Sequence, residues 1–239
     1  MKLKLALLLI AAFSFGVAAQ TVTITPKKVT YKRSKPREDF KKTFTITYPK
    51  VRAANSQVSQ KIERAISYQS VLDLRLNVEL RTSEWLETAD YDVKYNKNGI
   101  LCIQLSMDGS AAYPDGTIKV VCVDTGIGVR ARPADVFTNI AGLTSMVRKA
   151  QEKEKRDAIP RIKKDEPDIE QPELLFGDRH FTQKDIDGYE ISDKGVIFHY
   201  DYEFIHATRA LEPDGAFFFA WSQLRPYIKR GGLLTRVAR

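Results

Sequence analysis

The stretch YDVKYNKNGILCIQL, residues 91–105, decides the fold of this chain. Its first five residues alternate between polar and apolar side chains, as a half-buried strand does. The Asn98-Gly99 step that follows is typical of a tight turn between two antiparallel strands. The aliphatic run at 100–105 then predicts the returning strand. A β-hairpin therefore lies at the centre of the predicted fold.

A second aliphatic run, TIKVVCV at 117–123, follows after Gly109, Pro114, Asp115 and Gly116, residues that favour a turn. If this run pairs antiparallel with 100–105, Cys102 and Cys122 fall near opposite positions. In an oxidising compartment such a pair usually forms a disulfide. Two buried free thiols are the alternative.

The rest of the chain supplies further strands and several helices. Strands are predicted at 44–48 (ending at Pro49), 189–192, 196–200 and 216–221. Helices are predicted at 51–66, 139–164 and 223–229. Pro160 should break or kink the long helix, and Ser222 should cap the last one. Residues 71–80 alternate like a strand but also form a helical stripe, and their length favours a helix. The predicted fold class is α+β, a mainly antiparallel sheet with helices packed on it.

The first residues predict export. Lys2 and Lys4 precede an apolar run to Val17, and Val17 and Ala19 are small residues in the positions that signal peptidase accommodates. The run is shorter than the roughly 20 apolar residues that span a bilayer. We therefore expect a cleaved signal peptide at 1–19 and a periplasmic or secreted product without a membrane span. The mature chain is expected to begin with a basic extended segment at 20–42, which forms an edge strand or a flexible arm. One α+β domain is expected at 43–239.

Charge points to anionic partners. The formal net charge of +8 falls to about +6 when Lys2 and Lys4 leave with the signal peptide. The anionic partners that a basic exported protein meets in a bacterial envelope are polyanionic polymers or lipid headgroups. Nucleic acid is not expected as a partner, because no predicted helix carries a dense stripe of Arg and Lys.

Several short strings resemble a known family. They include 91–96 with 99–101, Tyr113-Pro114, 124–126 and 135–137, then 192–198, 201–204 and 222–227. Together they resemble the extracytoplasmic domain of unknown function shared by RsiV-type anti-sigma factors and PdaC-type peptidoglycan deacetylases, over roughly 43–229. A Pro-Tyr-Ala-Ala-Gly-like step of that family is replaced here by IHATR at 205–209.

The resemblance implies a stand-alone envelope domain. The anti-sigma members carry a transmembrane helix with a cytoplasmic segment, and the deacetylase members carry a separate metal-dependent catalytic domain. Neither is visible in this sequence. The implied role is binding of a cell-wall glycan or of a secreted protein such as a lysozyme.

Catalysis has weaker support in the sequence. There are three histidines, and no metalloprotease, nucleophile-elbow or Walker pattern is present, so neither a metal nor another cofactor is expected. Five carboxylates lie in a region expected to be compact: Asp185, Asp187, Glu190, Asp201 and Glu203. Two of them converging across a cleft would make a hydrolase of envelope glycans, which is the alternative function.

Binding is the preferred interpretation. Tyr113 lies in a loop where its ring can stack on a sugar or fill a groove of a partner. Tyr202 and His206, with Tyr200, form a second polar-aromatic group whose members are expected to share one sheet face. Tyr113, Tyr202 and His206 are the candidate binding residues of an exported, non-catalytic domain.

Overall fold

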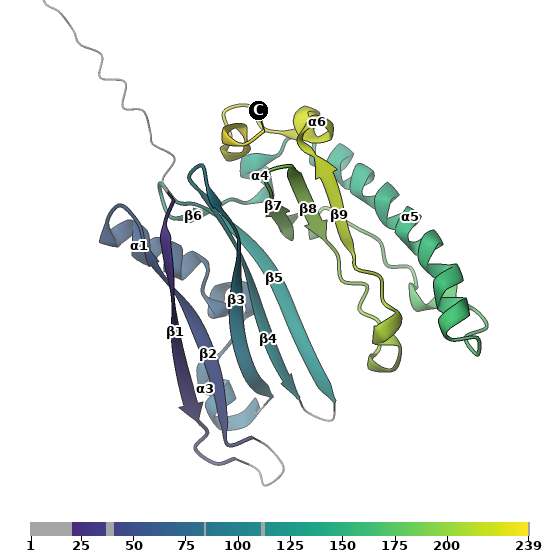
Figure 1. Cartoon of the computed structure of the whole chain (residues 1–239), viewed down its shortest axis with the longest axis horizontal. Coiled ribbons are helices and arrows are strands. Elements are labelled where there is room, and N and C mark those ends of the chain that lie inside the picture. Colours follow the sequence, from purple (N-terminus) through teal and green to yellow (C-terminus); the bar gives the residue numbers. More distant parts are fainter. Residues whose placement is uncertain (1–20, 37–40, 84, 111–112, 239) are drawn as a thin grey trace, which may run out of the picture.

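The structure is a computed structural model that describes residues 21–36, 41–83, 85–110 and 113–238. The predicted signal peptide lies outside the described residues. Figure 1 shows two sheets side by side, a six-stranded sheet in the order β1-β2-β3-β4-β5-β6 and a three-stranded sheet in the order β7-β8-β9. The α+β prediction is confirmed. None of the helices in the described residues combines the length and the apolar character needed to cross a membrane.

The basic N-terminal segment forms the edge of the large sheet. Strand β1 (Thr23–Lys32) pairs antiparallel with β2 (Thr43–Arg52) along its whole length, so the edge-strand alternative is the one observed. Strand β2 then makes a short parallel pairing with β3 (Leu86–Lys97), which requires a crossover between them.

The predicted end of a strand at Pro49 is wrong. Strand β2 continues to Arg52, which places Val51 in the strand, and α1 begins only at Ser56. Pro49 lies opposite Pro26 in the register. Two residues without N–H groups fit at a pair that exchanges no hydrogen bonds. Because the parallel pairing with β3 involves only residues 45 and 46 of β2, Pro49 removes no bond there either.

The central hairpin forms as predicted. Asn98 and Gly99 both have positive φ angles, 54° and 73°, as the tight turn between twisted strands requires. Strand β4 (Ile100–Ser110) pairs with β3 on one side and with β5 (Pro114–Asp124) on the other. Cys102 lies directly opposite Cys122, and the two are joined by a disulfide with a Cα–Cα distance of 4.0 Å.

The crossover from β2 to β3 is helical and covers one face of the large sheet. It consists of α1 (Ser56–Ala65), α2 (Tyr68–Leu72), α3 (Leu76–Val78) and a π-helical turn over Glu79–Ser83. The helical interpretation of 71–80 holds, but as short pieces. Asp73 adopts a left-handed conformation, with φ of 51°, that ends α2 and prevents one continuous helix.

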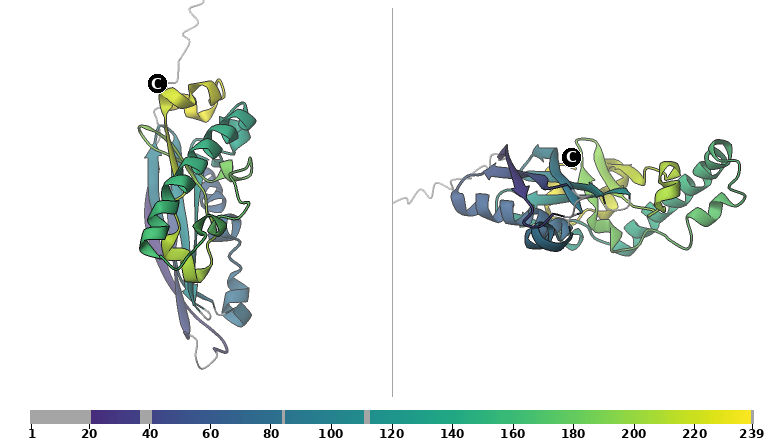
Figure 2. Two further views of the ribbon diagram at one scale, coloured as in Figure 1. Left: turned by 90° about the vertical axis from the view of Figure 1, so that its right-hand side faces the viewer. Right: turned by 90° about the horizontal axis from the view of Figure 1, so that it is seen from below.

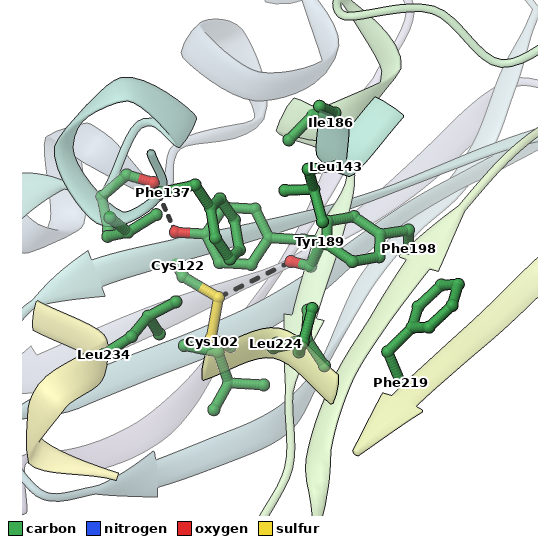
Figure 3. Packing of buried hydrophobic residues seen from close by; sticks show 14 of the residues in the cluster. Cys102, Cys122, Phe137, Leu143, Ile186, Tyr189, Phe198, Phe219, Leu224 and Leu234 are labelled. Atoms are coloured by element: carbon green, nitrogen blue, oxygen red, sulfur yellow. Dashed lines mark hydrogen bonds between the residues drawn. A yellow bond between two sulfur atoms is a disulfide. The ribbon is translucent and has the colours of Figure 1, made fainter. Parts of the chain in front are cut away.

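Strand β4 has a hydrophobic core on each side. Leu101, Ile103 and Leu105 pack with the crossover helices. Ile100 and Cys102 pack with the C-terminal half of the chain. The second core surrounds the disulfide, with Tyr189, Phe198, Phe219 and Leu224 among its labelled members in Figure 3.

The C-terminal half builds the second layer. It contains a short β6 (Val129–Arg130), α4 (Pro133–Val136), α5 (Ile140–Asp165), β7 (Tyr189–Ile191), β8 (Gly195–His199), β9 (Ala216–Ala220) and α6 (Trp221–Leu224). Helix α5 runs through Pro160 without ending there. Figure 2 shows α5 on the side of the small sheet, away from the β1 edge.

The prediction that Ser222 caps the last helix is wrong. Helix α6 begins one residue earlier, at Trp221, after the cap residue Ala220. The N–H of Ala220 donates to the Gln223 side chain at 3.0 Å, so Gln223 takes the stabilising role at this end. Helix α6 ends at Leu224, and a 3-10 turn over Arg225–Tyr227 follows.

Candidate functional site

The two layers touch at one end and separate toward the other. The side chains of β4 that face the small sheet change from apolar to polar in that direction: Ile100, Cys102, Gln104, Ser106, Asp108 and Ser110. On β5, Cys122 and Val120 are buried on this face, whereas Ile118 is 62% exposed. The separation leaves an open cleft of about 1330 Å³, whose floor includes Gln104, Asp108 and Ile118.

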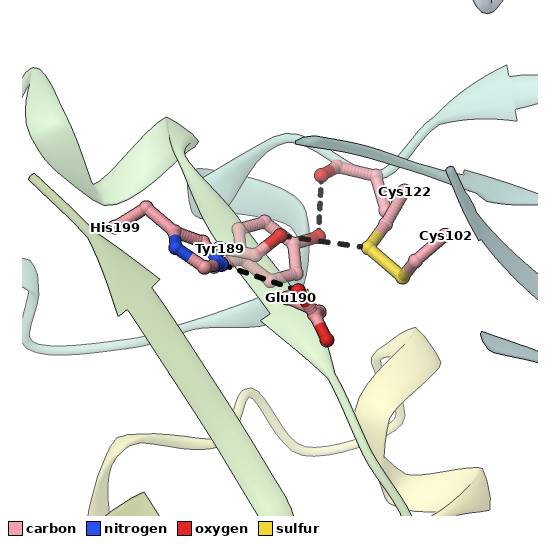
Figure 4. Close-up of a disulfide and its surroundings, with 6 residues drawn as sticks. Cys102, Cys122, Tyr189, Glu190 and His199 are labelled. Carbon is pink, nitrogen blue, oxygen red and sulfur yellow. Dashed lines mark hydrogen bonds and ion pairs between the residues drawn. A yellow bond between two sulfur atoms is a disulfide. The ribbon is translucent and has the colours of Figure 1, made fainter. Parts of the chain in front are cut away.

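The disulfide lies at the closed end of this wedge. The Sγ atom of Cys122 is 3.7 Å from the carbonyl oxygen of Tyr189 in β7 (Figure 4). A bonded cysteine carries no hydrogen, so the sulfur packs against this oxygen and does not donate to it. The Tyr189 hydroxyl donates to the carbonyl of Ala131 at 2.6 Å. These contacts fix β7 against β5 where the cleft begins.

The opposite wall comes from the C-terminal half. It is formed by the 3-10 turn Asp185–Asp187, by the end of β8 with His199 and Tyr200, and by the 3-10 helix His206–Leu211. The Nε2 atom of His199 donates a hydrogen bond to the Glu190 carboxylate at 3.2 Å (Figure 4). The wall therefore presents rings and carboxylates together.

Two of the three candidate binding residues meet at the rim of the cleft. The rings of Tyr113 and His206 are stacked, with centroids 4.6 Å apart and an interplanar angle of 26°. Beside them, Arg209 pairs with Asp115 at 3.3 Å. Both contacts join the tip of the β4–β5 hairpin to the 3-10 helix of the other wall. Tyr113 remains 64% exposed.

The third candidate, Tyr202, lies in the core. It has no exposed surface, packs between Phe176 and Phe204, and donates its hydroxyl to Glu154 at 2.7 Å. Burial, followed by this hydrogen bond, raises the pKa of the Tyr202 hydroxyl. The expected shared sheet face is not observed, because Tyr200 and Tyr202 lie after β8 outside any strand and His206 lies in a 3-10 helix. The rings of Tyr200 and Tyr202 still contact each other, with centroids 5.0 Å apart.

The predicted carboxylates divide between the cleft and its surroundings. Asp185, Asp187 and Asp201 line the cleft. Asp187 pairs with Arg130 at 3.3 Å, and Asp185 accepts hydrogen bonds from both the N–H and the hydroxyl of Thr182 at 2.6 Å. Glu203 lies outside the main cleft and pairs with Arg179 at 3.7 Å.

One carboxyl pair is electrostatically unusual. Burial, then a hydrogen bond with Asp201 and the negative charge of Asp201, raises the pKa of Glu212, against an opposing effect of Arg209. Arg209 lies 3.9 Å from Glu212 while also holding Asp115. The same arginine thus balances carboxylates from both walls.

The lining as a whole is slightly acidic. Seven Asp and Glu residues face five Lys and Arg residues. Glu87 has a lowered pKa because Lys41 donates a hydrogen bond to it, with a second bond from Ser110. No group of three or more His, Cys, Asp and Glu side chains in the described part of the chain is arranged to hold a metal ion.

Ile118 and Arg209 were missed as site residues. One signal was present in the sequence: from Gln104 onward, the β4 positions on the disulfide face are polar, which indicates that this face leaves the core. The position of Arg209 depends on a loop packing against a distant hairpin, and no local pattern encodes that.

Fold and cleft together define the class of protein: an α+β domain in which a disulfide-linked hairpin separates two cores and an open polar cleft lies between two sheets. No protein-family model and no curated protein matches the sequence. Among solved structures, the chain is similar to a DUF3298 family protein from Pseudomonas aeruginosa, with a TM-score of 0.56 and 12% identity over 87% of this chain and 94% of that one. It is also similar to a member of the same family from Bacteroides fragilis, with a TM-score of 0.54 and 12% identity over 91% and 98%.

These neighbours establish a shared fold. Both belong to an uncharacterised domain family, which agrees with the sequence-based expectation of a domain of unknown function. Neither is described as an anti-sigma factor or a deacetylase, so that part of the resemblance stays a prediction.

Proposed function

We propose that this protein is an exported, non-catalytic binding domain whose cleft holds a cell-wall glycan. The observation that carries the proposal is the exposed Tyr113 ring, stacked on His206 at the rim of a polar cleft. Such a ring offers one free face to a ligand, and its position is already fixed by the stack and by the neighbouring Arg209–Asp115 pair.

The chemistry of the lining and its rim suits a sugar chain. A pyranose has an apolar face that packs on aromatic and aliphatic side chains, here Tyr113 at the rim and Ile118 in the lining. Its hydroxyl groups hydrogen-bond to carboxylates and amides, here Asp108 and Gln104. The acidic excess of the lining favours a neutral stretch of glycan over a polyanion in the cleft itself.

The compartment supports this ligand. The predicted signal peptide would deliver the chain to the side of the membrane where wall glycans lie. The buried Cys102–Cys122 disulfide is of the kind that persists in oxidising compartments. Export and ligand class therefore point in the same direction.

The arrangement of carboxylates favours binding over hydrolysis. Glycosidases hold two carboxyl groups at about 5–10 Å across the scissile bond, and one of them must have a raised pKa. Here the carboxyl with the raised pKa, Glu212, is hydrogen-bonded to Asp201 and is therefore too close to it for that geometry. Asp115 and Asp187 are engaged by arginines.

A sedimentation assay with insoluble peptidoglycan tests the proposal. We expect the mature protein to be retained, and Tyr113→Ala to weaken retention about tenfold, the value of one stacking contact. Phe218→Ala is the matched control, because Phe218 is similarly exposed, at 51%, but lies on β9 outside the cleft lining. Equal retention of the wild type and Tyr113→Ala would exclude the cleft as the glycan-binding site.

Two further outcomes of this assay would contradict the proposed function and favour another one. Release of soluble sugars from the peptidoglycan, abolished by Asp201→Asn, would show the alternative carboxylate-dependent hydrolase. Retention on immobilised lysozyme without retention on peptidoglycan would replace the glycan by a secreted protein partner.

A further inference from the structure

The positive charge of the protein is concentrated in one part of the chain. Residues 21–65 contain twelve Lys and Arg residues and three Asp and Glu residues, a net charge of +9. Residues 66–239 contain 24 and 27, a net charge of −3. The basic character of the mature chain therefore belongs entirely to β1, β2, α1 and their connections.

The outer strand of this basic region lies at the edge of the large sheet that is away from the cleft, whereas Lys41, in the β1–β2 connection, lines the cleft. Strand β1 is the outermost strand, three places from β4 in the sheet order, and it borders only β2 (Figure 1). Lys27, Lys28 and Lys32 are all exposed on it. They extend over roughly 16 Å of strand at 3.3 Å per residue. Lys28 and Lys32 project to one face of the strand and Lys27 to the other, so the charges line both sides of an open sheet edge.

Most of these cations have no acidic partner among the described residues. Arg33 is buried beside Glu79, Lys41 pairs with Glu87, and Lys50 pairs with Glu63. The others in the described part of the region are exposed and make no ion pair with a described residue: Lys27, Lys28, Lys32, Lys35, Lys42, Arg52, Lys61 and Arg64. Uncompensated cations at this density attract a polyanion.

The surface is suited to a polymer better than to a bilayer. All the large apolar side chains that the described residues expose lie beyond residue 65, so the described part of the basic edge exposes no large apolar side chain for insertion among lipid tails. Its exposed side chains are Lys, Thr and Pro along one strand, a linear arrangement.

We propose that the β1 edge is a second binding site, for a linear polymer that carries phosphate groups along its length. Phosphates contact Lys28 and Lys32 on one side of the edge and Lys27 on the other, and Arg52 adds a cation on the neighbouring strand, where it lies opposite Thr23. The site is independent of the cleft. Together they let one domain contact an anionic polymer and a glycan at the same time.

Calorimetric titration with linear inorganic polyphosphate tests this site on the mature full-length chain. We expect Lys27→Gln/Lys28→Gln/Lys32→Gln to weaken binding at least tenfold, and a rise in salt from about 50 to 200 mM to weaken wild-type binding similarly. The matched control removes three exposed lysines of α5, as Lys149→Gln/Lys163→Gln/Lys164→Gln, and should bind as the wild type does. Unchanged thermal unfolding shows that both variants are folded.

Each other result overturns the proposal. Equal binding by the β1 variant places the site elsewhere, and equal losses in both variants indicate only net charge. If orthophosphate at the same phosphate concentration competes with polyphosphate, the edge is a local anion site and does not recognise a polymer. If vesicles containing phosphatidylglycerol bind as tightly as polyphosphate, with the same dependence on the three lysines, the partner of this edge is a membrane surface.

Discussion

Removing the Cys102–Cys122 disulfide should destabilise the protein substantially without changing the cleft. The bond links directly opposite positions of β4 and β5 inside the core between the two layers, and the two cysteines are 0% and 3% exposed. Two perturbations separate its effects. Reduction keeps both sulfur atoms in place, whereas Cys102→Ala/Cys122→Ala also removes their volume beside Tyr189.

The magnitude follows from the length of the closed loop. The cysteines are 20 residues apart in the sequence. Loop-closure entropy in the unfolded chain then corresponds to about 3 kcal/mol at 25 °C. The double alanine variant should lose roughly 1–2 kcal/mol more, because two buried sulfur atoms leave a cavity that the surrounding strands only partly fill.

Urea unfolding at equilibrium, followed by fluorescence, measures these differences. The oxidised chain, the chain in excess reductant and the double variant are compared, and thiol titration of the denatured protein confirms the redox state of each. A loss below about 1 kcal/mol on reduction would refute the loop-closure reasoning. Peptidoglycan retention by the folded double variant should equal that of the wild type, because the disulfide lies behind the cleft.

Three further predictions concern single residues. Glu212→Gln should raise the free energy of unfolding at pH 7. Folding raises the pKa of Glu212, so its carboxyl group stabilises the folded state most when protonated, and this stabilisation is lost as pH rises through the folded pKa. The advantage of Glu212→Gln should therefore disappear below about pH 4, where the carboxyl group is protonated in both states. Gly215→Ala should lower the free energy of unfolding, measured by thermal unfolding, by more than about 2 kcal/mol, because φ is 60° and a Cβ atom would lie 1.9 Å from the Tyr200 carbonyl oxygen. Gly177→Ala is the control: φ is 51° but the space around it is open, so it should lower the free energy of unfolding by only about 1 kcal/mol. Tyr202→Phe should lower stability by about 1 kcal/mol through loss of its hydrogen bond and leave glycan retention unchanged.

The sequence was most informative where the determinants are local. The Asn98-Gly99 turn set the register of the central hairpin, and alternation in the next two strands placed Cys102 opposite Cys122. The long helix was also correctly located because its apolar residues recur over many turns. In these segments, short-range geometry and the tertiary structure agree.

The errors arose where tertiary pairing decides the conformation. Pro49 reads as the end of a strand, but Pro26 on the neighbouring strand makes its position acceptable, and nothing near Pro49 encodes that partner. Tyr202 and Tyr113 have the same type of side chain, yet one is fully buried and the other 64% exposed. The cleft itself results from the angle between two sheets, which depends on packing around the disulfide.

Because β4 is buried on both faces, few substitutions in this strand are compatible with the fold. Ile100 to Leu105 contact one core or the other at nearly every position, so a replacement tolerated by one layer still has to fit a strand shared by both. The edge strand β1, which has mostly exposed side chains, carries no such packing restriction, and only the lysines of the proposed polymer site constrain it. Substitutions should therefore accumulate at the other exposed positions of this edge and be rare in the central strand. The central strand is where homologues too distant for whole-chain alignment should remain recognisable.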